Sequence, residues 1–301
     1  MPASRLRPTQ LPAEPSEKGA QSTILRELRI RQVRFACKVL RASAWFRLGR
    51  SFIRGYRRTE IGRAVLNVAL GYARPFRTLP EAEAAVLPYA GGGHRNEANV
   101  DLHLKLNRKP RPSDYAAMFH LAENCSTARS IFDFGGNVGN LYYCYAKYIR
   151  FRNDLIWSVY DLPDNIKRGE QLAEDRKAQR LRFTERLDDA SGADVLIASG
   201  SLHYFDKPLP QIVEELPRKP HFVLVNRTPL TDAGNIAIVQ DAGAFRVACM
   251  LYNRDELIRD FVRLGYRVVS TWEAPELKLD VPASPEHSVS AYSGFWLELP
   301  A

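Results

Sequence analysis

Residues 131–140 constrain the fold of this chain more than any other stretch. An apolar run that ends at Phe134 leads into a turn containing Gly135, Gly136 and Gly139, and residues 141–148 follow with a helical pattern. Glycines permit positive φ and allow close approach of a ligand, and a helix N-terminus behind them presents unpaired N–H groups. A strand, a tight turn and a helix in this order predict a cofactor-binding α/β unit.

After this turn, strand and helix patterns alternate to the end of the chain. The alternation predicts an α/β fold with a Rossmann-like, doubly wound parallel sheet. Seven strands are predicted, at residues 130–134, 155–160, 182–184, 194–198, 221–226, 266–271 and 292–299. Helices are predicted at residues 78–87, 113–124, 138–148, 165–180, 209–216 and 253–264, with Ser113 as a cap. A proline-bearing stretch at 273–288 separates the last two strands and favours a terminal antiparallel hairpin.

An acid precedes the glycines, because residues 133–139 read Asp-x-Gly-Gly-x-x-Gly and not Gly-x-Gly-x-x-Gly. A pyrophosphate would meet the like charge of Asp133, whereas the sulfonium and α-ammonium groups of S-adenosylmethionine are stabilised by a nearby carboxylate. A second acid, Asp161, ends the next predicted strand, where it can accept hydrogen bonds from both ribose hydroxyls. The residues expected to bind this cofactor are Asp133, Gly135, Gly136, Asn137, Gly139, Asp161 and Leu162. The alternative is a glycine turn that merely lets a helix pack on a strand.

The fourth predicted strand ends at Ser199 and Gly200, which we expect on the cofactor side, since ligands of open α/β sheets bind at this edge. His203 and Tyr204 follow and are expected over the acceptor. A histidine with an ordinary pKa of about 6.5 suits proton removal from a hydroxyl near neutral pH. The alternative role of His203 is to line the pocket or cap a helix. A stretch including Gln240 could cover the acceptor pocket.

The fifth predicted strand leads into Asn226 and Arg227 at the same edge. Arg227 is a candidate for binding a carboxylate or phosphate of the acceptor. The alternative is an ion pair with Asp161, Asp206 or Asp232. We group Arg227 with His203 and Tyr204 as the candidate catalytic residues.

These segments resemble a bacterial family of class I S-adenosylmethionine-dependent methyltransferases associated with surface-polysaccharide and O-antigen gene sets. The matching segments are residues 133–139, 198–204, 226–229, 239–240, 265–266 and 292–294. The resemblance implies a seven-stranded class I methyltransferase sheet, S-adenosylmethionine as cofactor, and O-methylation of a glycan or related small molecule. Asn226 departs from the family pattern, which usually has Asp there, and His203 stands where Gln is common. If that Asp were catalytic, Asn226 would leave His203 as the better base.

The basic residues are concentrated ahead of the glycine turn. Residues 1–110 hold 21 Lys and Arg against 8 Asp and Glu, whereas residues 111–301 hold 22 against 26. We expect a disordered N-terminus at 1–21, a basic helical extension at 22–93 and a methyltransferase domain at 94–301. Residues 24–58 form an amphipathic arm that either packs on the catalytic domain, lies on an anionic membrane face or, least favoured, binds nucleic acid.

The chain carries no apolar run near the ~20 residues that span a bilayer and no secretory signal. Its four cysteines are widely spaced without a CxxC pair, so neither a disulfide framework nor a metal site is expected. These features favour a cytoplasmic protein, peripheral at the inner membrane face if the basic arm binds lipid. Two other functions stay open: a dinucleotide-dependent oxidoreductase or epimerase, and a non-catalytic adaptor that docks on a membrane through its arm.

Overall fold

The computed structural model describes residues 75–86, 104, 107–124, 127–241, 246–279, 281 and 284–300. The chain divides into two compact units, Met1–Leu70 and Gly71–Ala301, and all described residues belong to the second. The expected disordered N-terminus, the basic arm at 24–58 and the domain boundary at 93–94 fall outside the described residues. Among those described, no helix is long and apolar enough to cross a membrane.

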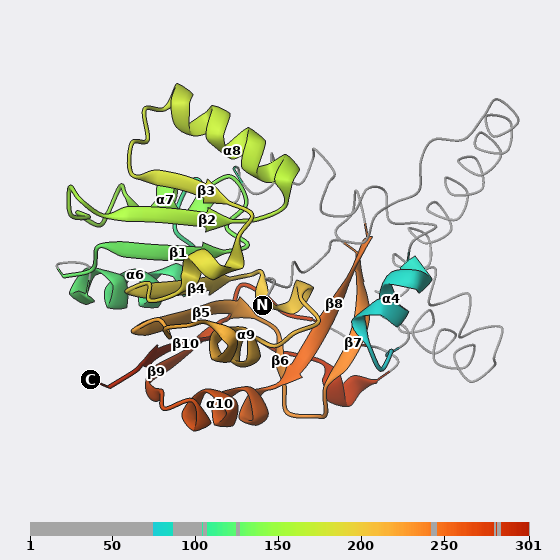
Figure 1. Cartoon of the computed structure of the whole chain (residues 1–301). Coiled ribbons are helices and arrows are strands. Elements are labelled where there is room, and N and C mark those ends of the chain that lie inside the picture. The colour runs from blue at the N-terminus through green and yellow to red at the C-terminus, as the bar shows by residue number, and fades with distance from the viewer. Residues whose placement is uncertain are drawn as a thin grey trace, which may run out of the picture. The chain divides into compact units, whose positions relative to one another are not determined.

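A seven-stranded sheet in the order β3-β2-β1-β4-β5-β10-β9 forms the centre of the second unit (Figure 1). β1 to β5 run parallel, whereas β10 lies antiparallel between β5 and β9. The strands are β1 (Ser130–Phe134), β2 (Ile156–Tyr160), β3 (Leu181–Thr184), β4 (Val195–Ser199), β5 (Phe222–Thr228), β9 (Arg267–Ala274) and β10 (Tyr292–Glu298). All seven predicted strands and the terminal antiparallel hairpin are confirmed.

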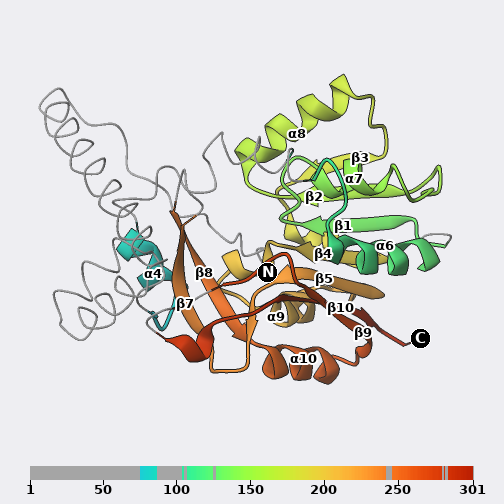
Figure 2. The same ribbon diagram turned by 180° about the vertical axis from the view of Figure 1, so that it is seen from behind.

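Helices cover both faces of the sheet because both faces of its strands are apolar (Figure 2). One face packs Trp157 and Trp296 against helices α6 (Pro112–Asn124), α7 (Asn140–Tyr145) and α8 (Pro163–Asp175). The other packs Phe134 and Phe295 against α9 (Leu209–Glu215) and α10 (Arg254–Arg263). Among the described residues, three short 3₁₀ helices join the elements: η3 (Leu187–Ala190), η4 (Leu202–Tyr204) and η5 (Pro285–His287).

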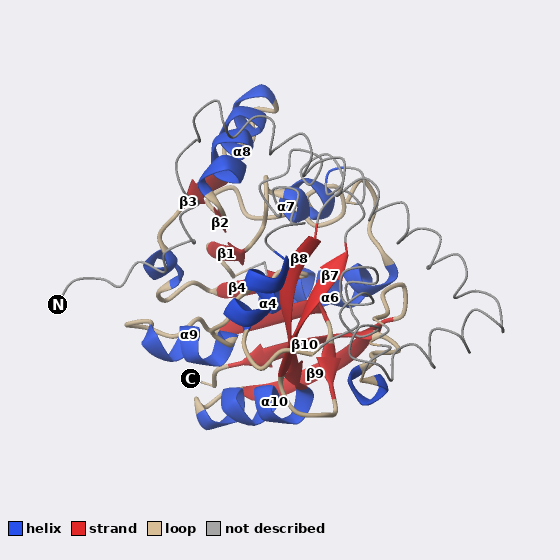
Figure 3. Ribbon diagram, turned by 90° about the vertical axis from the view of Figure 1, so that its right-hand side faces the viewer, coloured by secondary structure: helices blue, strands red, loops and turns tan. Residues whose placement is uncertain are grey.

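A second sheet, which the sequence analysis did not predict, follows β5. It has the order β6-β8-β7, with bounds Leu230–Thr231, Arg246–Asn253 and Ile236–Asp241. Its two longer strands, β7 and β8, lie side by side in Figure 3. Helix α4 (Leu79–Val86) packs Leu79 and Ala82 against this sheet, and Phe76 exchanges two main-chain hydrogen bonds with Ala237. Part of the stretch that the sequence analysis assigned to the extension, residues 76–86, therefore packs on the small sheet.

Candidate functional site

The turn after β1 takes the conformation that its glycines allow. Gly135 has φ 72° and Gly139 has φ 82°, while Asn137 between them has φ 57°. Asparagine tolerates this left-handed region better than most residues. The Gly135 N–H donates to the Tyr160 carbonyl at 2.8 Å, which fixes the turn against the end of β2.

The three turn glycines are needed by the protein's own packing. A Cβ atom on Gly135 would lie 2.4 Å from Ser201 Cβ, one on Gly136 would lie 2.5 Å from Asp133 Cγ, and one on Gly139 would lie 2.7 Å from Leu181 Cδ2. Close approach of a ligand is therefore not required to explain these glycines. By contrast, a Cβ atom on Gly200 would meet nothing within 4 Å, so open space lies at the end of β4.

Asp161 joins the end of β2 to the glycine turn. Its carboxylate accepts hydrogen bonds from the Asn137 N–H at 2.7 Å, the Leu162 N–H at 2.7 Å and Asn165 Nδ2 at 2.6 Å. Burial raises the pKa of Asp161, and these three bonds oppose that shift. A carboxylate offers about four acceptor positions, so about one is left for a ribose hydroxyl. A bond to the second hydroxyl would require displacement of one of these donors.

Asp133 lies beneath Gly136 and is 1% exposed, so it does not reach the surface of the turn. Trp157 Nε1 donates to its Oδ2 at 3.1 Å. Burial raises the pKa of Asp133 to about 7, which the Trp157 bond opposes and the nearby Asp161 charge favours. Asp133 therefore acts on any cation in the site through its charge and not by contact.

The end of β4 connects the turn to the small sheet. Ser201 Oγ donates to the Phe134 carbonyl, and the Gly200 N–H donates to the Asn226 carbonyl at 2.9 Å. His203 is buried in η4, with its ring centroid 4.1 Å from that of Tyr204. Tyr204 Oη donates to Gln240 Oε1 at 2.7 Å, so the predicted covering stretch does contact this residue.

A β-bulge turns two consecutive side chains of β5 toward α6. Ser293 pairs with Thr228 and Phe295 pairs with Val225, so Asn226 and Arg227 together oppose one residue of β10. Arg227 has φ 52°, an uncommon conformation for a side chain of this size. In a regular strand these two side chains would point to opposite faces.

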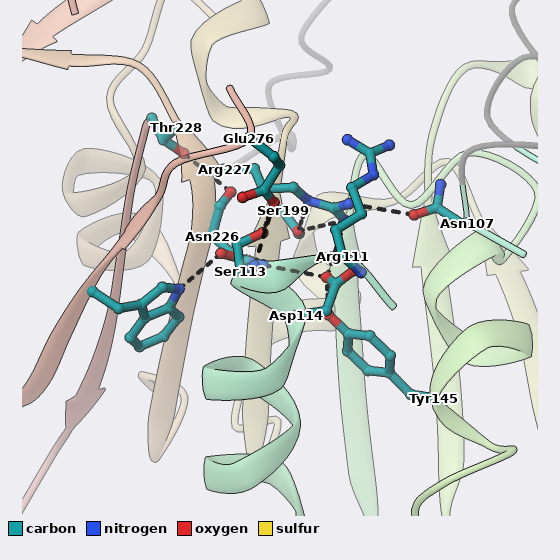
Figure 4. Close-up of polar contacts among 11 residues, drawn as sticks. Asn107, Arg111, Ser113, Asp114, Tyr145, Ser199, Asn226, Arg227, Thr228 and Glu276 are labelled. Atoms are coloured by element: carbon teal, nitrogen blue, oxygen red, sulfur yellow. Dashed lines mark hydrogen bonds and ion pairs between the residues drawn. The ribbon is translucent and has the colours of Figure 1, made fainter. Parts of the chain in front are cut away.

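Arg227 is buried in a polar network at the N-terminus of α6 (Figure 4). Its Nε and Nη2 donate to Ser199 Oγ at 3.2 and 3.0 Å, and its Nη1 donates to Asn107 Oδ1 at 3.3 Å. Its ion-pair partner is Asp114, with 3.6 Å between Nη2 and Oδ1. The alternative role considered for Arg227, an ion pair with Asp161, Asp206 or Asp232, is therefore wrong.

Asp114 is the charged partner in this network, and the sequence analysis missed it. It is fully buried and accepts hydrogen bonds from Tyr145 Oη at 2.7 Å, the Arg111 N–H at 2.8 Å and Asn226 Nδ2 at 3.4 Å. Burial and the Asp114 charge raise the pKa of Tyr145 well above its ordinary value. In the sequence, Asp114 is indistinguishable from an ordinary acid in the first turn of a helix.

The start of α6 also differs from the prediction. Ser113 lies inside the helix and its hydroxyl donates to Glu276, so it does not act as the cap. Asp114 instead accepts from the N–H of Arg111, the residue before the helix. Within the described ranges, no three His, Cys, Asp or Glu side chains are grouped to hold a metal ion.

No protein-family model matches the chain, and no curated protein matches its sequence. Many solved structures resemble it at low identity. The mitomycin 7-O-methyltransferase MmcR has a TM-score of 0.45 and 17% identity, over 87% of this chain and 68% of its own. The Burkholderia thailandensis 1,6-didemethyltoxoflavin-N1-methyltransferase, solved with S-adenosylhomocysteine, has a TM-score of 0.43 and 15% identity. That match covers 64% of this chain and 80% of the methyltransferase. The N-terminal domain of EvdMO1, also solved with S-adenosylhomocysteine, has a TM-score of 0.42 and 14% identity. That match covers 63% of this chain and 81% of the EvdMO1 domain.

The strand order decides the fold independently of these similarities. Five strands, in the order β3-β2-β1-β4-β5, are parallel, and β10 lies antiparallel between β5 and β9. This arrangement differs from the all-parallel sheet of dinucleotide-binding folds. The chain has a class I methyltransferase fold. One fold supports many activities, so the activity has to be argued from the site.

Proposed function

We propose that the protein is an S-adenosylmethionine-dependent methyltransferase. The observation that carries this proposal is the hydrogen bond of the Asn137 N–H to Asp161, which joins the glycine turn and the acid after β2 at one edge of the sheet. The turn residues 135–139, Asp161 and Leu162 would hold the cofactor, and Ser199 and Gly200 would lie beside the open space at the end of β4. The carboxyl of Asp133 is buried behind the turn, and its pKa of about 7 leaves it only partly charged near neutral pH.

S-adenosylmethionine supplies an electrophilic methyl group on a sulfonium, and its transfer requires mainly in-line alignment with the acceptor. The acceptor side of the proposed site is formed by η4 and β5. We assign removal of the hydroxyl proton to His203, whose ring packs on that of Tyr204 in η4. Asn226 is not a candidate base, because an amide does not titrate near neutral pH.

The acceptor we favour is a hydroxyl of a glycan or a related small molecule, as in bacterial surface-polysaccharide synthesis. The support is the resemblance of residues 198–204 and 226–229 to that family. We place the protein in the cytoplasm. Contact with the inner membrane face through residues 24–58 stays a prediction, because those residues are outside the part of the chain described.

Calorimetric titration of the full chain with S-adenosylhomocysteine tests the proposal. We expect binding that is at least tenfold weaker in Asp161→Asn and unchanged in Asp164→Asn, which alters an exposed acid in the first turn of α8. If NAD(H) stabilises the protein and S-adenosylhomocysteine does not, the chain is a dinucleotide enzyme. Cofactor binding without methyl transfer to any acceptor, together with vesicle sedimentation that is lost on deletion of residues 1–60, would identify an adaptor.

A further inference from the structure

Two guanidinium groups lie side by side at the carboxyl edge of β5. Arg111 precedes α6 and is half-buried, and Arg227 follows the bulge of β5 and is buried. Figure 4 shows the Arg111 side chain extending past the Arg227 guanidinium and away from Asp114. Placing two like charges together is unfavourable unless anions offset both.

The charge of Arg227 is offset within the protein. It forms the ion pair with Asp114 and donates to Ser199 and Asn107. This network fixes Arg227 in place, so its guanidinium is a rigid neighbour for Arg111.

The charge of Arg111 is offset less completely. Among the described residues, no hydrogen bond or ion pair reaches its guanidinium, since Asp114 contacts only its main-chain N–H and Glu276 accepts from Ser113. Burial and the Arg227 charge lower the pKa of Arg111, and the charges of Asp114 and Glu276 do not fully reverse this shift. A half-buried guanidinium whose five donors have no partner among the described residues is suited to a ligand oxyanion.

The position of this pair favours the acceptor over the cofactor. The glycine turn follows β1 and Asp161 follows β2, whereas Arg227 lies at the end of β5. Neighbouring strands are about 4.8 Å apart, so β5 lies roughly 10 Å from β1 and 14 Å from β2. Ser199 and Gly200, at the end of β4, separate the two regions.

We propose that the methyl acceptor carries an anionic group, a carboxylate or a phosphate ester, which the Arg111 guanidinium binds. This inference rests on the proposed function, because it names the acceptor class of that same site. The planar fork of Arg111 would take two oxygens of the anion, and Arg227 behind it would add a fixed positive charge.

The experiment measures the thermal midpoint of the full chain saturated with S-adenosylhomocysteine, in sodium phosphate and in sodium chloride of equal ionic strength. Inorganic phosphate is the probe for the acceptor anion. We expect phosphate to raise the midpoint of the wild type by about 2 °C more than that of Arg111→Gln. Arg259→Gln, which removes the same charge from the exposed surface of α10, should behave as the wild type. Arg111→Lys keeps the charge without the fork and should show an intermediate shift.

Phosphate also stabilises proteins generally, so an equal shift in all four proteins overturns the proposal. A second outcome overturns the acceptor assignment: Arg111→Gln weakens S-adenosylhomocysteine tenfold but leaves 5′-methylthioadenosine, which lacks the carboxylate, unchanged. In that case Arg111 binds the cofactor's own carboxylate. If the wild type binds neither nucleoside, the proposed function fails, and the phosphate comparison on the free protein still decides whether Arg111 binds an oxyanion.

Discussion

Arg227 and Asp114 form a buried ion pair between the end of β5 and the first turn of α6, with 3.6 Å between Nη2 and Oδ1. Their side chains are 6% and 0% exposed, so water offsets neither charge. Asn226, the residue before Arg227, donates to the same oxygen of Asp114. One carboxylate thus holds both residues of the bulge and fixes the edge of the proposed acceptor site.

Asp114→Asn removes the negative charge while keeping the shape of the side chain. Because the Arg227 charge would then be buried without its partner, we expect the free energy of unfolding to fall by about 3–5 kcal/mol. Urea denaturation at neutral pH measures this loss. Asp188→Asn, an exposed acid in η3, is the control and should change stability by less than about 0.5 kcal/mol. A similar small effect for both variants would contradict a structural role of the ion pair.

Asn226→Asp restores the acid that the resembling family usually has, but it does not suit this structure. Asn226 accepts from Trp272 Nε1 at 2.9 Å and donates to Asp114, and a carboxylate could make only the first of these bonds. Burial and the Asp114 charge would raise the pKa of the new acid. We therefore expect the variant to be less stable than the wild type, and more so at pH 8 than at pH 5. Thermal midpoints at the two pH values measure this; an unchanged midpoint at pH 8 would show that the Asn226–Asp114 bond is dispensable.

Asp133→Asn should change how stability depends on pH. The folded-state pKa is about 7 against an ordinary 3.8, so the folded protein keeps a proton that the unfolded chain has released. The stabilisation is complete below about pH 4 and is lost as pH rises through about 7. Between pH 6 and 8 the loss is about 1.4 kcal/mol.

The measurement is a urea titration of wild type and Asp133→Asn at pH 6, 7 and 8. The variant lacks the titrating group, so its stability should fall less than that of the wild type over this range. Parallel curves for the two proteins would assign the pH dependence to another residue.

Gly136→Ala tests whether the turn glycines serve packing. The new methyl group would lie 2.5 Å from the Asp133 carboxyl, which is buried and bonded to Trp157, so we expect a loss of about 1–3 kcal/mol. Gly234→Ala is the matched control, because nothing lies within 4 Å of its new Cβ atom. Thermal unfolding without ligand compares the two. Full stability of Gly136→Ala, combined with weaker cofactor binding, would instead indicate that the glycine serves the ligand.

The sequence alone determined the main sheet. Its strands are short apolar runs, or alternating ones as in β9, and such local patterns are set by residues close together in the chain. The same holds for the glycine turn, where positive φ at Gly135 and Gly139 is a local requirement. The small sheet β6-β8-β7 was not predicted, although residues 236–239 and 247–252 are apolar runs of the same kind. What the sequence does not show is their pairing with each other and with the distant Phe76, which depends on the tertiary structure.

The candidate site also has residues that the sequence identified and one that only the structure revealed. The sequence identified the strand ends that carry Asp161, Ser199 and Arg227, because parallel strands bring their carboxyl ends to one edge. It could not identify Asp114 as the partner of Arg227, since that contact depends on the packing of α6 against β5 and on a bulge in the β5–β10 pairing. Sequence periodicity determines which segments form strands and helices, and only the tertiary structure decides which buried charges meet.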